Sequence, residues 1–393
     1  MSITLKSRLS LVPHQIIKDK KNYIVEDISS NEFYEMPEVC IAAIDLINSG
    51  KTLEEIEMQL KDKYPNEEVD LLDFAEQLLN LQLIAEIDGV KFETKKNNKE
   101  SLGFSWISPW FGKFFFNKIS YFFYISLFII NLFLFILNPS LFPRFKDLFI
   151  YDIMALNIPI WLVLSFTLVL IHEFGHILAI RAQNLPTKLE VGHRLFLVVL
   201  ETDMSAVWKL PSKDRNVLFL AGLGFDTVIL SFSLISQLTF THGSGIFLSI
   251  INVVVLDTFI RMVYQCCIFM KTDLYYVFEN VSGCYNLMEN AEHTIRKMLP
   301  FLNSETAKEV VFEGERNTVF VYSIFYFIGI ALTFSLFAIY YIPQLLFALK
   351  KVLPGFSLGP ASISFWDAFL FTLQLIIGML ILLYSWRKKY LYK

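Results

Sequence analysis

The chain is poor in charge and in cysteine. Only 18% of its 393 residues are charged and the formal net charge is −4, which gives no indication of nucleic-acid binding. The four cysteines lack metal-ligand spacing, so the sequence predicts neither a disulfide framework nor a cysteine zinc site. The first twenty residues lack the apolar centre of a secretory signal, so we expect the first hundred residues to stay in the cytosol.

Long apolar segments are abundant. Hydrophobic residues make up 54% of the chain and the mean hydropathy is +0.49, values typical of a polytopic membrane protein. We therefore expect an α-helical polytopic membrane protein with about six transmembrane helices. Each of the following apolar segments is near or above the length that crosses a bilayer: residues 119–137, 158–180, 217–240, 246–270, 319–346 and 365–386.

Charge density divides the chain into three regions. Residues 1–93 are soluble in character and should form a cytosolic domain. Residues 94–118 combine a Lys-rich linker with aromatic residues such as Trp106 and Trp110, which are typical of a membrane interface. Residues 119–393 should form the transmembrane domain.

The second apolar segment contains the motif His172-Glu-Phe-Gly-His176. On a helix, two histidines four residues apart share a face and can bind one Zn²⁺, and Glu173 between them can act as general base. A carboxylate and two imidazoles are costly inside an apolar helix, which favours a functional role. The alternative is that these are ordinary polar residues lining the interior of a helix bundle.

The distribution of Lys and Arg predicts the orientation. Residues 181–215, 271–316 and 387–393 hold fifteen of them, whereas the alternate loops hold four. By the positive-inside rule the basic set is cytoplasmic. Both termini are then inside the cell, and the motif lies near the cytoplasmic end of its helix.

A catalytic zinc normally takes three protein ligands and a water molecule. We expect Asp273 to follow the end of the fourth segment, at a depth similar to that of His176. Asp257 and Arg261 are four residues apart and are expected to form a structural ion pair on one helix face. The competing ligands are His193, Asp203, Asp226 and Asp257.

Three segments between residues 158 and 287 resemble the site-2 protease family of intramembrane zinc metalloproteases, and within it the branch of peptide zinc metalloproteases. They are the motif at 172–176, then Asp203-Met-Ser-Ala-Val-Trp208 with Leu210-Pro211 and Ala221-Gly222, and finally Lys271-Thr-Asp-Leu-Tyr-Tyr276. The resemblance implies that Asp273 is the third zinc ligand.

The chain departs from the family pattern at several positions. Cys267-Ile268 stands where the family often has Asn-Pro, Leu274 replaces a Gly, and Leu223 replaces a Pro. Asp226 stands where the family has an Asn that helps to hold substrate or oxyanion. The resemblance therefore makes Asp226 the candidate for substrate positioning.

Residues 188–207 are rich in β-branched and apolar side chains and predict a short hairpin at the membrane surface, with Gly192 marking a bend. An exposed strand edge beside a zinc site can hold a substrate in an extended form by strand addition. The alternative is an ordinary packed hairpin.

The N-terminal region predicts short strands followed by three helices. The strands are residues 23–27 and 32–36, with a closing strand at 84–87. Pro37 opens a first helix that Gly50 ends, Thr52 and Glu55 make a capping box for a second helix, and residues 69–83 form an amphipathic third helix. The expected fold is a small α+β winged-helix domain.

This domain resembles the PqqD-like recognition element of ribosomally made peptide pathways. The resemblance implies that a leader peptide adds as a strand between the third strand of the domain, here residues 32–36, and the third helix. DNA binding is not expected, because the third helix is acidic and would repel phosphates. The implied peptide-binding residues are Glu32, Phe33, Tyr34, Phe74, Gln77 and Leu78.

Together these features predict an intramembrane zinc metalloprotease that cleaves a small ribosomally made precursor peptide near the cytoplasmic face of the membrane. Its expected partners are the precursor peptide, the lipid bilayer, and a peptide exporter or modifying enzyme. One alternative is regulated cleavage of a membrane-anchored signalling protein. The other is a non-catalytic membrane subunit that binds a peptide for export or immunity.

Overall fold

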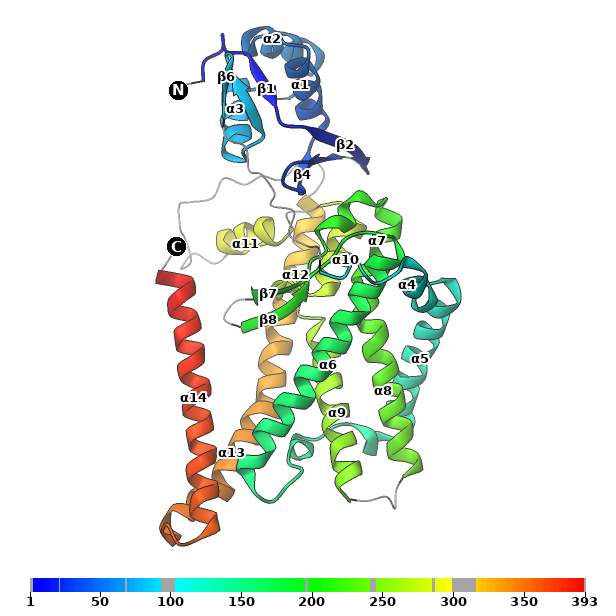
Figure 1. The fold of residues 1–393 in the computed structure, drawn as a ribbon, viewed down its shortest axis with the longest axis vertical. Helices are drawn as coiled ribbons and strands as arrows, with labels where there is room; N and C mark the ends of the chain where they lie inside the picture. The colour runs from blue at the N-terminus through cyan, green and yellow to red at the C-terminus, as the bar shows by residue number, and fades with distance from the viewer. Residues whose placement is uncertain are drawn as a thin grey trace. The chain divides into compact units, whose positions relative to one another are not determined.

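The computed structural model describes residues 3–20, 22–67, 69–92, 103–194, 197–240, 245–284, 287–298 and 316–391 (Figure 1). The chain divides into two compact units. The first holds Met1–Leu102 and Met204–Arg215, and the second holds Gly103–Asp203 and Asn216–Lys393. The first part of the expected linker and interface segment, residues 94–102, lies outside the described residues.

The first unit is rich in strands. Two antiparallel sheets have the strand orders β1-β5-β6 and β2-β3-β4, so β4 pairs only with β3 among the described residues. The predicted strands are confirmed as β3, β4 and β5, whereas β1, β2 and β6 were not predicted. The strand bounds are β1 Leu9–Leu11, β2 His14–Asp19, β3 Asn22–Asp27, β4 Glu32–Met36, β5 Ile84–Ile87 and β6 Val90–Lys91.

Three helices bury one apolar face each in this unit: α1 (Glu38–Asn48), α2 (Leu53–Lys63) and α3 (Leu71–Asn80). The predicted capping box is confirmed, because the Thr52 hydroxyl accepts from the Glu55 N–H and the Glu55 carboxylate accepts from the Thr52 N–H. The third helix is shorter than expected. Asp70 caps its start. Gln82, beyond its end, has a φ of 59°, a left-handed conformation that does not occur inside a right-handed helix.

The second unit is predominantly helical. Six helices among the described residues are long and apolar enough to cross a membrane, which agrees with the number of predicted segments. They comprise Pro109–Leu137, Met154–Ala182, Ser212–Thr239, Gly245–Tyr264, Arg316–Leu358 and Ile363–Arg387. The helix bounds are α4 Pro109–Phe115, α5 Lys118–Leu137, α6 Met154–Ala182, α7 Ser212–Phe219, α8 Ala221–Thr239, α9 Gly245–Tyr264, α10 Asp273–Ser282, α11 Leu287–Met298, α12 Arg316–Leu336, α13 Ile342–Val352 and α14 Ile363–Leu391.

The fourth apolar helix ends earlier than predicted. α9 stops at Tyr264, and a 3₁₀ turn at Ile268–Met270 leads to Lys271, whose φ of 51° turns the chain. The Thr272 hydroxyl then donates to the carbonyl of Gln265 across this turn (2.7 Å). Asp273 therefore begins α10 rather than following directly on the fourth span, which corrects the prediction.

The expected hairpin is present as β7 (Leu189–Arg194) paired antiparallel with β8 (Leu197–Thr202). The predicted bend at Gly192 is wrong, because Gly192 lies within β7 and pairs with Val199. A Cβ at Gly192 would meet the carboxylate of Glu201, so a glycine leaves room for that side chain.

Close helix packing surrounds the second half of α6. Figure 1 shows α6, α8 and α9 side by side, and all three helices contact one another. Gly112 of α4 approaches the α6 backbone so closely that a Cβ would lie 2.5 Å from the carbonyl oxygen of Leu178. The buried guanidinium of Arg181 donates to the carbonyls of Ser105, Ile107 and Leu185. These contacts fix the end of α6 that carries the candidate site.

Candidate metal centre

The structure brings His172 and His176 of α6 together with Asp273 at the start of α10. The Nε2 atoms of the two histidines lie 3.3 Å apart, and Asp273 Oδ2 lies 3.1 Å from His172 Nε2 and 3.3 Å from His176 Nε2. All three side chains are buried. In the described part of the chain, these three side chains form a group whose ligand atoms all lie within 4.8 Å of one another, close enough to hold a metal ion.

These separations fit a zinc ion. Zinc bonds of about 2.0–2.1 Å in a tetrahedron place neighbouring ligand atoms about 3.3 Å apart. The three measured separations lie within 0.2 Å of that value. Two imidazole nitrogens and one carboxylate oxygen also match the donor types that zinc takes in catalytic sites, and they leave a fourth position for water or substrate.

Hydrogen bonds orient both imidazole rings. His172 Nδ1 donates to Asp226 Oδ2 (2.8 Å), and His176 Nδ1 donates to the carbonyl oxygen of Leu218 (2.9 Å). A carboxylate and a carbonyl can only accept, so the hydrogen of each neutral ring lies on Nδ1. Both Nε2 lone pairs then face Asp273, as metal binding requires.

Gln265 holds the third ligand in place. Its amide nitrogen donates to Asp273 Oδ2, and its amide oxygen accepts from the Asp273 backbone N–H, each at 3.0 Å. The ionised carboxylate is the form that binds a metal.

The candidate base Glu173 is buried and is held by the hairpin. Glu173 Oε2 accepts from both the backbone N–H of Thr202 (2.9 Å) and its hydroxyl (2.7 Å). Thr202 is the last residue of β8 and was not predicted to take part in the site. Both hydrogen bonds go to Oε2, so Oε1 takes no part in them, and together they orient the carboxylate.

Gly222 of α8 lies against the candidate ligands. A Cβ at this position would lie 2.4 Å from His172 Nε2 and 2.6 Å from His176 Nε2. Gly175 of α6 lies just as close to α8, because its Cβ would meet the Ala221 carbonyl oxygen at 2.9 Å. Glycines on both helices therefore leave the space that the two imidazoles occupy between α6 and α8.

The competing ligands lie elsewhere or have other partners. Asp226 is bonded to His172 through Nδ1, and its expected role in substrate positioning stays a prediction. The predicted pair of Asp257 and Arg261 is confirmed. Asp203 is not part of the cluster, and the side chain of His193 lies outside the described atoms.

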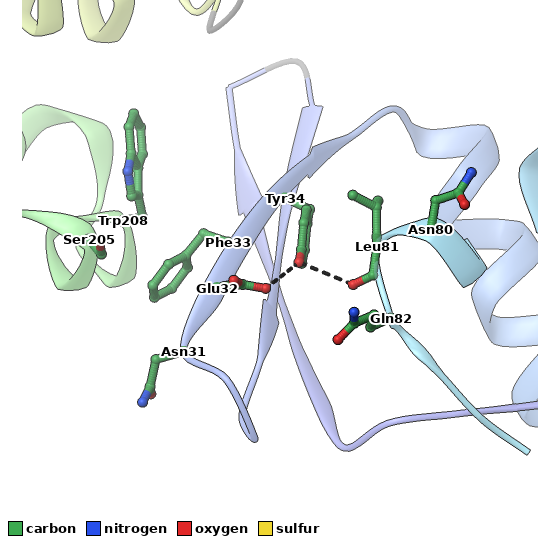
Figure 2. Close-up of a pocket in the computed structure, with 9 residues that line it drawn as sticks. All are labelled: Asn31, Glu32, Phe33, Tyr34, Asn80, Leu81, Gln82, Ser205 and Trp208. Carbon is green, nitrogen blue, oxygen red and sulfur yellow. Dashed lines mark hydrogen bonds between the residues drawn. The ribbon is translucent and has the colours of Figure 1, made fainter. Parts of the chain in front are cut away.

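A cavity of about 460 Å³ lies beside β4 in the first unit (Figure 2). Five of its lining residues come from Met204–Arg215 or from the end of α3 and the turn after it, and they were not predicted: Asn80, Leu81, Gln82, Ser205 and Trp208. Within the same unit Lys209 Nζ pairs with Glu26 Oε1 (2.6 Å), which holds this segment against β3. The full lining is Asn31, Glu32, Phe33, Tyr34, Asn80, Leu81, Gln82, Ser205 and Trp208.

The predicted peptide-binding residues divide into two groups. Those on β4 line the cavity, and the Tyr34 hydroxyl donates to Glu32 Oε2 (2.7 Å), as Figure 2 shows. The three predicted on α3 do not line it. Leu78 is buried in the core, Phe74 packs against the core, and Gln77 donates to a neighbouring carboxylate on its own helix.

Comparison with known protein families, with curated proteins and with solved structures finds no match to this chain. The fold and the site therefore define the class of protein. It is a predominantly helical chain with six helices long enough to cross a membrane and a buried cluster of two histidines and one aspartate.

Proposed function

We propose that this protein is a zinc endopeptidase of the site-2 protease type that cuts a small ribosomally made precursor peptide at the membrane. The observation that carries the proposal is the grouping of three donor atoms at 3.1–3.3 Å, directly beside a buried glutamate. Two imidazoles, a carboxylate ligand and an adjacent carboxylate base are the parts that metal-assisted hydrolysis of an amide needs.

In the proposed reaction His172, His176 and Asp273 hold the zinc ion. Zinc bound there would supply the Lewis acidity that hydrolysis of an amide by a water molecule needs. Glu173 accepts the proton of that water and then donates it to the nitrogen of the leaving amine. Thr202 keeps the Glu173 carboxylate oriented through both steps. Burial of these groups strengthens their interactions, because little water screens them.

Both termini lie in the cytoplasm in the proposed orientation. This orientation follows from the excess of Lys and Arg in alternate loops, and it brings the zinc site near the cytoplasmic face of the cell membrane. A precursor peptide made in the cytosol then reaches the site from the side on which it is synthesised.

The cavity beside β4 is the proposed docking site for the leader, on a domain of PqqD-like winged-helix type. β4 is an edge strand of its sheet in the described part of the chain, and an edge strand is where a peptide can add as a further strand. Phe33 and Trp208 give the cavity an aromatic lining that suits an apolar side chain of such a peptide. Both features lie in the first unit and need no contact with the second.

The catalytic claim is tested with Glu173→Gln. Wild type and variant are purified in detergent, incubated with a peptide library, and the new N-termini are identified by mass spectrometry. The expected result is cleavage by wild type alone, with equal zinc in both proteins, because the variant keeps all three ligands. The same new N-termini from both proteins would show that Glu173 is not the base. Bound zinc with no cleavage by wild type would favour a peptide-binding subunit.

The docking claim is tested with Phe33→Ala on a peptide that wild type cleaves. We expect a lower kcat/KM for the full-length peptide and no change once its leader is removed. Met58→Ala is the control, because Met58 is an exposed apolar residue on α2 outside the cavity. Equal kcat/KM for both variants on the full-length peptide would refute docking at β4.

A further inference from the structure

Asp226 is completely buried in α8, and its two oxygens face different partners. Oδ2 accepts the hydrogen bond from His172 Nδ1 at 2.8 Å. Oδ1 lies 3.7 Å from Arg261 Nη1 and makes no hydrogen bond in the described part of the chain. Arg261 itself is bonded to Asp257, one turn earlier on α9. The carboxylate thus lies between a candidate metal ligand and a guanidinium group.

The buried charges around the cluster are mainly negative. A carboxylate that is fully buried in an apolar helix is costly unless charged or hydrogen-bonding partners compensate it. Arg261 is the cation among these groups, and it faces two of the carboxylates. A divalent cation at the three donor atoms would compensate two of the three remaining negative charges. The nearly or fully buried carboxylates are Glu173, Asp226, Asp257 and Asp273.

The chemistry at position 226 decides where the hydrogen of His172 lies. A carboxylate accepts with either oxygen, so it holds the hydrogen on Nδ1 and leaves the Nε2 lone pair for the metal. An amide of the same shape has one accepting and one donating end. Arg261 has only donors, so an amide would turn its oxygen toward Arg261 and its NH₂ toward His172. Nδ1 would then accept, and the ring hydrogen would move to Nε2, where it blocks metal binding.

We propose that Asp226 and Arg261 together fix the tautomer of His172, and that Arg261 is the reason why a carboxylate rather than an amide is needed at position 226. Both are positioning residues for the zinc site, and neither contacts the metal. This proposal rests on the zinc site of the proposed function. Loss of a partner that orients a metal-binding histidine typically weakens metal binding by about 10- to 100-fold.

The test measures the zinc dissociation constant of the full-length protein in detergent by competition with a chromophoric chelator. Asp226→Asn is expected to weaken zinc binding at least tenfold. Asp257→Asn is the matched control. It removes a carboxylate from the same Arg261 but leaves the bond between Asp226 and His172, so we expect a change of less than about threefold.

The double variant Asp226→Asn/Arg261→Gln separates tautomer control from simple loss of structure. With the guanidinium gone the amide is free to turn its oxygen toward His172, so zinc binding should recover most of the loss. Co²⁺ bound in place of zinc gives a second readout, because its visible spectrum reports the ligand set. We expect the Asp226→Asn spectrum to change and the double-variant spectrum to return toward wild type. Gel filtration before each titration removes unfolded protein.

The outcomes distinguish the two claims. Wild type with no affinity for zinc overturns the metal site, and this proposal with it. Wild type that binds zinc while Asp226→Asn binds equally well overturns this proposal alone. A double variant that binds no better than Asp226→Asn also overturns it, because Arg261 would then have no part in the orientation of His172.

Discussion

Replacing Gly222 with Ala tests whether the space between the two imidazoles is the metal position. The added Cβ would lie 2.4 and 2.6 Å from the Nε2 atoms of His172 and His176, well inside van der Waals contact. A zinc ion about 2.0–2.1 Å from both atoms would then be no more than about 3 Å from the new methyl group, on whichever side of the imidazole pair it sits. The methyl group and the metal therefore compete for one space.

The cost follows from this overlap. Neither neighbour can move easily, because His172 and His176 are each fixed through Nδ1. Forcing a methyl group into such a site typically costs about 1–3 kcal/mol, which corresponds to a fivefold to more than hundredfold loss of zinc affinity. The same contact must be relieved in the protein without zinc, so the zinc affinity of Gly222→Ala is measured on protein that elutes as wild type does on gel filtration.

The assay is zinc affinity by chelator competition, with Gly224→Ala as the control on the same helix. A Cβ at Gly224 would meet the ring of Tyr124 at 3.2 Å, a contact that a small ring movement relieves, and it lies away from the histidines. We expect weakened zinc binding in Gly222→Ala and wild-type binding in Gly224→Ala. Wild-type zinc affinity in Gly222→Ala would refute the assigned metal position.

Three further predictions concern the residues that support the site and the first unit. Thr202→Val removes the hydroxyl that donates to Glu173 and should lower kcat about tenfold or more with the zinc content unchanged. Thr202→Ser keeps the hydroxyl and should retain most activity. Equal kcat values in the two variants would contradict this role of Thr202. Arg181→Met leaves three carbonyls without their donor and should lower stability by about 3 kcal/mol, seen as a lower midpoint of thermal unfolding; an unchanged midpoint would argue against it. The hydrogen bond from the Thr52 N–H lowers the pKa of Glu55, so the capping box stabilises α2 above the ordinary carboxyl pKa of 4.5 and is lost as the pH falls through the lowered value. The protection factors of the α2 amides, which compare their exchange rates with those of the unstructured chain at the same pH, should therefore fall at acidic pH in wild type and depend less on pH in Glu55→Gln.

The grouping of the three donor residues was predictable from the sequence. The spacing of His172 and His176 places both rings on one helix face, and a polar residue at the same membrane depth was sought as the third ligand. Asp273 was predicted as that residue, and the structure groups its side chain with those of His172 and His176. Asp273 lies at the start of α10, however, and not directly after the fourth span. A helix end within an apolar stretch leaves little signal in composition, so the true end at Tyr264 was missed.

The residues that support the ligands were not predictable in the same way. Thr202 lies 29 residues from Glu173, and the Leu218 carbonyl lies 42 residues from His176. No local pattern reports contacts of that range, and a backbone carbonyl has no side chain to reveal it. Gln265 did leave a signal, because an amide in a segment predicted to span the membrane is unusual and needs a polar partner.

In the first unit, local chemistry predicted the three helices better than the strands. Helix starts depend on nearby residues such as Thr52 and Asp70, whose side chains cap the chain end to which they belong. β1 depends on pairing with a strand far along the chain, as in the pairing of Leu9 with Ile87, whereas β2 and β6 pair with the strands next to them in sequence, β3 and β5. The 3-residue length of β1 gives too little alternation to identify it alone.

The central claim is most directly tested by the zinc content of the protein, measured by elemental analysis after purification in detergent without chelator. The account predicts about one zinc per chain in wild type and in Glu173→Gln, and little or none in Asp273→Ala and His176→Ala. A metal-free wild type, or a full zinc complement in Asp273→Ala, would contradict the three-ligand site and the peptidase function built on it.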